Sequence, residues 1–211
     1  MEYIQIPLGP IQTNCYIVKN ENQSCLIFDP GAEGNKLIQF LKNEGLNPVA
    51  ILLTHAHFDH IGAVDDIRDY FQIPVYLHEN EADWLGNPDL NGSNFLTHDL
   101  LIKIKPADYL LKGEKELKIG DFSFFSYETP GHSPGSLSYY FQDSRYVISG
   151  DALFQGSIGR TDLVGGNHDQ LIESIHAKLL TLAEDTIVLP GHGPSTTIGM
   201  EMDSNPFLNG F

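Results

Sequence analysis

Cysteine is scarce in this sequence, which has only two in 211 residues, Cys15 and Cys25. Both are expected to lie in strands joined by a turn around residues 20–23. Pairing about that turn would set Cys15 opposite a residue near Phe28, so no disulfide is predicted between the two cysteines. Two free thiols indicate a reducing compartment.

Long apolar segments are also missing. The longest run, residues 49–53, is far too short to cross a lipid bilayer. Residues 1–7 have no basic start and no apolar stretch, so no signal peptide is expected. Low-complexity tracts and long blocks of like charge are absent as well. We therefore expect a soluble cytoplasmic protein that has no membrane partner.

Basic side chains are few. Twelve Lys and Arg residues against 28 Asp and Glu residues give a formal net charge of −16. Such a polyanion repels nucleic acid phosphates and anionic lipids, so no nucleic acid partner is expected. Bound divalent cations would reverse the field only where they bind. The charge balance therefore favours a small, anionic substrate drawn to a local positive site.

Apolar periodicity predicts a mixed α/β chain in which strands precede helices twice. Helical spacing occurs at residues 37–41, from about Ile61 to Phe71, and at residues 171–182. Residues 79–100 are expected to form an irregular surface segment with one short helix. The chain is long enough to bury a core as one domain over residues 1–211, or as two packed halves. The strands are predicted at residues 3–6, 14–18, 25–28, 49–53, 75–77, 117–119, 122–127, 137–141, 146–148 and 187–189.

Seven residues of the kind that ligate metals follow predicted strands. Four of them lie within residues 54–60, too close in sequence to serve one ion tetrahedrally, and three follow in Gly-containing turns. Imidazole and carboxylate suit zinc, manganese or iron, and a carboxylate can bridge two ions. Packing explains a single histidine but not this whole set, so we predict a two-metal hydrolytic centre. The seven residues are His55, His57, Asp59, His60, His132, Asp151 and His192.

The motif H-x-H-x-D-H, followed in order by G-H, G-D and G-H, resembles the metallo-β-lactamase superfamily. The resemblance extends from Asn14 almost to the C-terminus. It implies a four-layer αββα sandwich of the α/β (α+β) class, with the site at one edge and with Asp151 bridging two ions. The implied ligands are His55, His57 and His132 for metal 1, and Asp59, His60 and His192 for metal 2.

Within the superfamily, the chain is similar to the short glyoxalase II-like, or hydroxyacylglutathione hydrolase-like, thioester hydrolases. The similarity rests on Asn14-Cys15-Tyr16, on residues 156–162 and on Asn205-Pro206-Phe207. Because the chain ends soon after His192, the added C-terminal helical domain that provides much of the glutathione contact in glyoxalase II is expected to be absent. True β-lactamases are expected to be less similar, because they are exported and usually lack counterparts of His60 and Asp151. The net charge argues against the nuclease branches.

The resemblance implies hydrolysis of an acyl thioester by a hydroxide that bridges two divalent metal ions, expected to be zinc, with iron or manganese as alternatives. The metals would stabilise the oxyanion and the leaving thiolate, so no protein nucleophile is required. Asp59 would orient the hydroxide in addition to binding metal 2. The expected partner is a small thioester, and the acyl group, the thiol carrier and the oligomeric state stay open.

Other polar residues have two interpretations each. Arg160, in the loop of residues 155–166, is a candidate for binding a substrate carboxylate, and a structural ion pair with Asp162 is the alternative. Asp29 is a candidate for holding a ligating histidine in place, or else a plain turn carboxylate. The remaining histidines are assigned surface or hydrogen-bonding roles: His78, His98, His168 and His176.

Two rival functions follow from the same residues. Persulfide dioxygenases also resemble this chain, including the Gly-Arg-Thr-Asp run at residues 159–162, and their single iron would be held by His55, His132 and Asp151. The Pro-Gly-His-Gly setting of His192 favours the dinuclear hydrolase instead. A non-enzymatic metal-binding or scaffold role is the third hypothesis, and a complete ligand set beside Gly-containing turns speaks against it.

Overall fold

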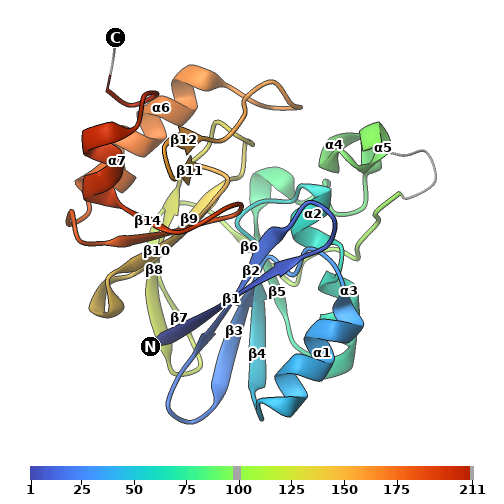
Figure 1. Cartoon of the computed structure of the whole chain (residues 1–211). Helices are drawn as coiled ribbons and strands as arrows, with labels where there is room; N and C mark the ends of the chain where they lie inside the picture. Colours follow the sequence, from blue (N-terminus) through green and yellow to red (C-terminus); the bar gives the residue numbers. More distant parts are fainter. Residues whose placement is uncertain (97–100, 210–211) are drawn as a thin grey trace. The chain divides into compact units, whose positions relative to one another are not determined.

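The computed structural model describes residues 1–96 and 101–209, and it divides into two compact units. The first unit comprises Met1–Lys112 and Ile119–Phe122, and the second comprises Gly113–Lys118 and Ser123–Phe211. Each unit contains a six-stranded sheet with α-helices beside it (Figure 1). The mixed α/β class predicted from the sequence is confirmed.

The sheet of the first unit has the strand order β1-β2-β3-β4-β5-β6. Neighbours are antiparallel from β1 to β3 and parallel from β3 to β6. Parallel neighbours end at the same edge of a sheet, so the residues that follow β3, β4 and β5 come close together. The bounds are β1 Glu2–Leu8, β2 Thr13–Lys19, β3 Ser24–Phe28, α1 Gly34–Asn43, β4 Asn47–Leu52, α2 Phe58–Ile61, α3 Val64–Phe71, β5 Val75–His78 and β6 Tyr109–Leu111.

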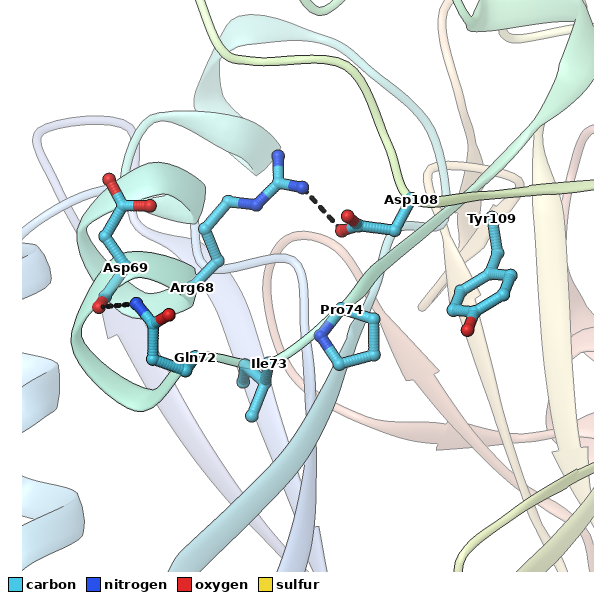
Figure 2. Close-up of a pocket in the computed structure, with 7 residues that line it drawn as sticks. All are labelled: Arg68, Asp69, Gln72, Ile73, Pro74, Asp108 and Tyr109. Carbon is cyan, nitrogen blue, oxygen red and sulfur yellow. Dashed lines mark hydrogen bonds and ion pairs between the residues drawn. The ribbon is translucent and has the colours of Figure 1, made fainter.

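A surface pocket of about 410 Å³ lies where α3 and the start of β6 meet. Its polar groups already bond to one another: Nη2 of Arg68 donates to Asp108 across 2.5 Å, and the Gln72 amide donates to the carbonyl of Asp69 across 2.7 Å (Figure 2). Asp108 also accepts from the backbone N–H of Val75. These contacts join the amino end of β5 to β6, opposite the edge where the parallel strands end.

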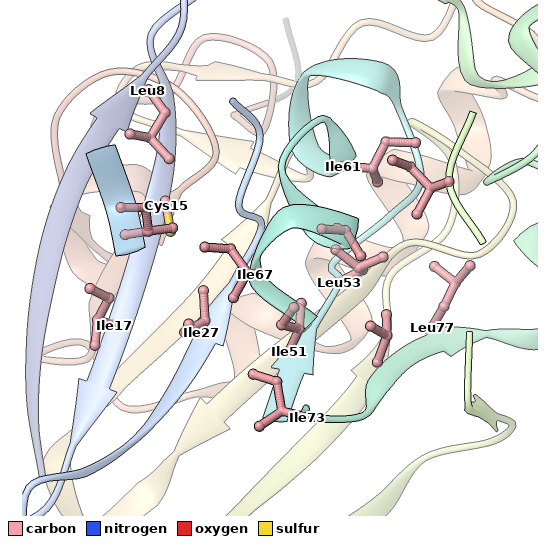
Figure 3. Packing of buried hydrophobic residues seen from close by; sticks show 14 of the residues in the cluster. Leu8, Cys15, Ile17, Ile27, Ile51, Leu53, Ile61, Ile67, Ile73 and Leu77 are labelled. Atoms are coloured by element: carbon pink, nitrogen blue, oxygen red, sulfur yellow. The ribbon is translucent and has the colours of Figure 1, made fainter. Parts of the chain in front are cut away.

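The core of the first unit packs helices against one face of the sheet. Figure 3 shows Ile27 and Ile51 of the sheet close to Ile67 of α3, within a cluster of fully buried side chains. The alternate residues Leu26 and Leu52 point to the other face and are buried too. Continuous apolar strands of this kind are buried on both faces, as predicted for residues 49–53.

Residues 79–96 contain more helix than the sequence predicted. A 3-10 helix, η1 (Glu79–Glu81), precedes α4 (Pro88–Asn91) and α5 (Ser93–Leu96). The prediction of one short helix is therefore wrong, because helices of three or four residues are too short to show a period. The rest of this predicted segment, including His98, lies outside the described residues.

The sheet of the second unit has the order β14-β13-β10-β9-β8-β7. Its neighbours β10 and β13 are parallel, and β11 and β12 form a separate two-stranded hairpin. The predicted helix at residues 171–182 is wrong in extent, since α6 ends at Ala177 and a 3-10 helix, η3, follows. The bounds are β7 Lys115–Ile119, β8 Phe122–Glu128, β9 Leu137–Phe141, β10 Tyr146–Gly150, β11 Leu153–Phe154, β12 Ser157–Ile158, α6 His168–Ala177, η3 Leu179–Thr181, β13 Ile187–Pro190, β14 Thr196–Thr197 and α7 Ile198–Ser204.

Both cysteines are free and buried, which confirms the prediction of no disulfide. The register sets Tyr16 opposite Phe28 and Lys19 opposite Cys25, so Cys15 and Cys25 do not face each other across β2 and β3. In the part of the chain that the structure describes, no helix is both long and apolar enough to cross a membrane.

Candidate metal centre

The first unit gathers four of the predicted ligands directly after β4. Ligand atoms of His55 and His57 lie within 4.8 Å of each other, and so do those of Asp59 and His60. His57 is extended, with φ −67° and ψ 148°. The short helix α2 follows directly and contains Asp59 and His60. The three imidazoles are at most 5% exposed, and the structure brings them together with Asp59.

Asp29 organises the cluster from the end of β3. Its backbone has a φ of 49°, in the left-handed region that Asp tolerates better than most residues, and its side chain is buried. One carboxylate oxygen accepts from the backbone N–H of Thr54 at 2.8 Å. The other accepts from the Thr54 hydroxyl at 2.6 Å and contacts Nδ1 of His60 at 3.0 Å. The hydrogen bond that we expected between Asp29 and a histidine of the cluster is therefore present, and its partner is His60.

These bonds define which imidazole nitrogens are available. Because the carboxylate of Asp29 accepts, Nδ1 of His60 carries the proton and Nε2 is the acceptor atom. The Thr54 hydroxyl gives its proton to Asp29, so its oxygen accepts from Nδ1 of His55 at 3.0 Å. Nε2 of His55 is then the ligand atom as well. In both histidines, the nitrogen that suits a metal is the one left without the proton.

Two further hydrogen bonds restrain the segment of residues 55–60 that follows β4. Asp59 accepts from the Thr13 hydroxyl at 2.8 Å, and its carboxylate lies 3.6 Å from Nε2 of His60. Buried Glu81, after β5, accepts from the backbone N–H of Ala56 at 2.6 Å. The spacing of the ligands in sequence gave no signal for Thr13 or Glu81. Thr13 and Glu81 reach this loop only in the folded chain, where the strand ends converge.

The second unit places its three predicted ligands after β8, β10 and β13. The Asp151 carboxylate lies between two imidazoles, 3.6 Å from Nε2 of His132 and 3.5 Å from Nε2 of His192. Nδ1 of His132 donates to the backbone carbonyl of Arg160 at 2.7 Å. This bond again leaves Nε2 as the ligand atom. The side chain of His192 is the most exposed of the three, at 29%.

Arg160 has two distinct contacts. Its guanidinium forms two 2.7 Å hydrogen bonds with the Asp162 carboxylate, so the ion pair proposed as the alternative role exists. The hydrogen bonds from Arg160 lower the pKa of Asp162 to about 2. Its backbone carbonyl serves His132, a role that the sequence did not indicate. Gly159 is required here, because a Cβ would lie 1.8 Å from the carbonyl oxygen of Asp151.

Other polar candidates lie outside the ligand groups. Nδ1 of His78 accepts from the backbone N–H of Asn80, and His168 and His176 are exposed on α6, as predicted. Burial raises the pKa of the Cys15 thiol well above its usual value and that of Cys25 to about 12. Both thiols are therefore protonated at neutral pH and unsuited to nucleophilic attack.

The donors fit divalent metal ions. In each unit, neutral imidazoles present Nε2 next to a carboxylate oxygen, and each anchored Nδ1 bonds to a protein oxygen. Zinc and other borderline metals prefer this combination, and the second contact keeps each ring in place.

The fold and the ligand pattern define a family, and residues 8–192 match its model, the metallo-beta-lactamase superfamily. The chain belongs to this superfamily and is a metallo-hydrolase. It is 58% identical to the probable metallo-hydrolase YqgX of Bacillus subtilis, over 100% of this chain and 99% of that one. It is 36% identical to the hydroxyacylglutathione hydrolase GloC of Haemophilus influenzae, over 97% and 96% of the two chains.

Solved structures agree with the family. The crystal structure of the BLEG-1 B3 metallo-beta-lactamase is 61% identical, covers 99% of this chain and 100% of its own, and has a TM-score of 0.97. TTHA1623, crystallised in a di-iron-bound form, is 40% identical over 97% and 100% of the chains, with a TM-score of 0.86. ETHE1 from Myxococcus xanthus is 28% identical over 98% and 84%, with a TM-score of 0.80.

One of these structures corrects an expectation. The sequence motifs favour thioester hydrolases over β-lactamases as relatives of this chain. A protein whose structure is described as a B3 metallo-beta-lactamase is nevertheless 61% identical, against 36% for GloC. The expectation relied on cellular export and on two ligand positions, and neither excludes such a relative.

Proposed function

We propose that this chain is a dinuclear metal-dependent hydrolase of acyl thioesters. The observation that carries the proposal is the set of seven ligand-type side chains, several already oriented by hydrogen bonds, in a chain of the metallo-β-lactamase superfamily. In this proposal His55, His57 and His132 would hold metal 1, Asp59, His60 and His192 would hold metal 2, and Asp151 would serve both. The position of the Asp151 carboxylate between two imidazoles supports the bridging role.

Two bound metal ions supply a water of lowered pKa and positive charge opposite a developing oxyanion. The residues of this chain orient the reacting groups. Asp59 accepts from Thr13, which limits rotation of its carboxylate, so that it would orient the attacking water as well as hold metal 2. Asp29 and the Arg160 carbonyl keep His60 and His132 in one tautomer. With both thiols protonated and buried, the attack needs no covalent intermediate.

Zinc is the proposed metal, with iron and manganese as alternatives, since the di-iron form of TTHA1623 shows that a 40% identical protein accepts iron. We propose a small thioester substrate, no nucleic acid or membrane partner, and a cytoplasmic location. The similarity to GloC supports a hydroxyacyl thioester in particular.

The test is release of free thiol from S-lactoylglutathione and from several thioesters of other thiols. The metal-depleted protein should be inactive, and activity should return with about two equivalents of zinc. The Asp151→Ala variant serves as the matched control. Failure of the fully metallated protein to release thiol from any of the thioesters would exclude the thioester hydrolase function.

Hydrolysis of a β-lactam amide is a second candidate, favoured by the 61% identity with BLEG-1. Both reactions pass through a tetrahedral oxyanion, so the same metals serve either substrate. A chromogenic cephalosporin assayed beside the thioesters separates the two functions. A kcat/KM for the cephalosporin above that for every thioester would reverse the order of the two candidates.

Persulfide oxidation is the remaining alternative. It requires one iron ion with open positions for oxygen rather than two ions. Elemental analysis of protein purified without added metal decides between them. One iron per chain together with oxygen consumption in the presence of a persulfide would favour the dioxygenase over the hydrolase.

A further inference from the structure

Helix α7 carries a buried carboxylate, Glu201, whose hydrogen-bond donors in the described part of the chain are all neutral groups. Glu201 is 1% exposed, and the three groups that it contacts are all donors. One oxygen accepts from the backbone N–H of Gly156 at 2.8 Å and from the amide of Asn205 at 2.7 Å. The other oxygen accepts from the Thr196 hydroxyl at 2.6 Å. Burying a carboxylate is unfavourable unless donors surround it, and here they do.

Asn205 completes the same network. It is fully buried. Its side-chain NH₂ donates one hydrogen bond to the Glu201 carboxylate and another, of 3.1 Å, to the backbone carbonyl of Ser157. Its carbonyl oxygen accepts from the backbone N–H of Phe207. Asn205 and Phe207 belong to the Asn-Pro-Phe motif of residues 205–207.

Both residues therefore hold one small hairpin. Strands β11 and β12 have two residues each, with Leu153 opposite Ile158 and Phe154 opposite Ser157. A two-stranded hairpin is marginally stable in water by itself, and two residues a strand is the shortest case. The contacts from Glu201 and Asn205 reach the turn of this hairpin at Gly156 and Ser157.

All three ligand-type residues of the second unit border this hairpin. Asp151 precedes β11 by two positions, and the Arg160 carbonyl that accepts from His132 follows β12 by two positions. The Phe154 ring lies 6.2 Å from the His192 ring, edge to face. The backbone N–H of Gly159 donates to the carbonyl of Ala152, which closes the base of the hairpin. A shift of the hairpin would thus move or release all three side chains.

We propose that Glu201 and Asn205 are positioning residues for the metal centre, acting through the β11–β12 hairpin. The inference rests on the proposed function only in taking His132, Asp151 and His192 to be metal ligands. Neither residue is itself one of the proposed ligands. Through the hairpin, Glu201 and Asn205 keep the Arg160 carbonyl next to His132 and the Phe154 ring next to His192.

The test compares Glu201→Ala with Glu201→Gln. The glutamine oxygen can accept from Gly156 and Asn205, and its NH₂ can donate to the Thr196 hydroxyl, which rotates to accept. Alanine removes all three acceptors. We expect Glu201→Ala to lower zinc affinity roughly 10- to 100-fold, as for other groups that orient ligands, and Glu201→Gln to restore most of it. Zinc affinity is measured by competition with a chromogenic chelator.

A merely structural role is tested with Leu179→Ala, which truncates a fully buried side chain of the same unit outside the hairpin. This control should lower the unfolding temperature of the metal-free protein without changing zinc affinity. Should Glu201→Ala fail to fold, Asn205→Ala provides the same comparison with the Ser157 contact removed. Unchanged zinc affinity in the folded variant, or the same loss in Leu179→Ala, would overturn the proposal. Because the measurement is metal affinity, it stands apart from whether thioesters are the substrates.

Discussion

Nδ1 of His60 donates to the carboxylate of Asp29 across 3.0 Å, although the two residues lie 31 positions apart in the sequence. Both side chains are buried, at 0% and 1% exposure. The same carboxylate accepts from the backbone and the hydroxyl of Thr54, next to His55. One residue at the end of β3 thus sets the tautomer of one proposed ligand directly and that of another through a hydroxyl.

Asp29→Asn should weaken metal binding about 10- to 100-fold, the usual effect of removing a group that orients a ligand. The amide oxygen can still accept from the Thr54 N–H, but its NH₂ then faces Nδ1 of His60. This arrangement drives the His60 proton to Nε2. Asp108→Asn is the control, because Asp108 also accepts from a backbone N–H but at the opposite end of the parallel strands. Equal zinc affinities in the two variants would contradict the prediction.

Asp151→Ala should remove both metal ions, whereas His60→Ala should chiefly empty metal 2. In the proposed arrangement the Asp151 carboxylate would serve two ions, and His60 would serve one. Metal per chain, measured by mass spectrometry after gel filtration, distinguishes the two. His176→Ala, a change on the exposed face of α6, should keep both ions. Complete loss in both His60→Ala and Asp151→Ala would mean that the two positions cannot fill separately.

Arg160→Ala should raise the KM for a carboxylate-bearing thioester roughly three- to tenfold and leave that for a neutral thioester unchanged. This range lies below that of a well-shielded charged hydrogen bond, because the side chain is 63% exposed and already paired with Asp162. The backbone carbonyl that serves His132 is retained, so metal content should not change. An equal rise in both KM values would identify the Arg160–Asp162 pair as purely structural.

Gly31→Ala should destabilise the protein more than Gly45→Ala. A Cβ at Gly31 would lie 1.7 Å from the carbonyl oxygen of Asp59, so the chain that carries this ligand must move. At Gly45 the φ is +66° but the space around a Cβ is open, so the expected loss is only about 1–2 kcal/mol of backbone strain. Urea unfolding of both metal-free variants checks the order. Gly31→Ala should also lose zinc, and Gly45→Ala should not.

Cys15 and Cys25 should resist iodoacetamide in the folded protein at pH 8 and react rapidly after denaturation. Burial raises the pKa of Cys25 from 9.0 to about 12 and also raises that of Cys15 well above its usual value, so little thiolate exists. The sign of the linkage follows: the unfolded chain loses these protons first as the pH rises above about 9, so the fold should lose stability from there towards pH 12. Mass spectrometry counts the labels, and one label on the native protein would contradict the prediction.

The residues of each half of the site could be predicted from local signals. Runs such as residues 49–53 predict buried strands because a strand covered on both faces is apolar throughout. Ligand-type residues follow those runs, so their location after strands was predictable from the sequence. His55, His132, Asp151 and His192 do come shortly after strands, whereas Asp59 and His60 lie in the short helix α2. Short elements such as β11, β12 and α7 were not predicted, because two to seven residues give too little periodicity.

The sequence by itself determined the alternation of strands and helices, the order of the ligand-type residues and the absence of a disulfide. The tertiary structure decided which partners orient those residues. The Asp29 carboxylate bonds to His60, and the Glu81 carboxylate bonds to the loop that carries His57. The backbone carbonyl of Arg160 bonds to His132. The physical reason is that apolar periodicity is a local property of the chain. A hydrogen bond between distant residues depends on strand order, register and loop path, which exist only once the sheets have formed.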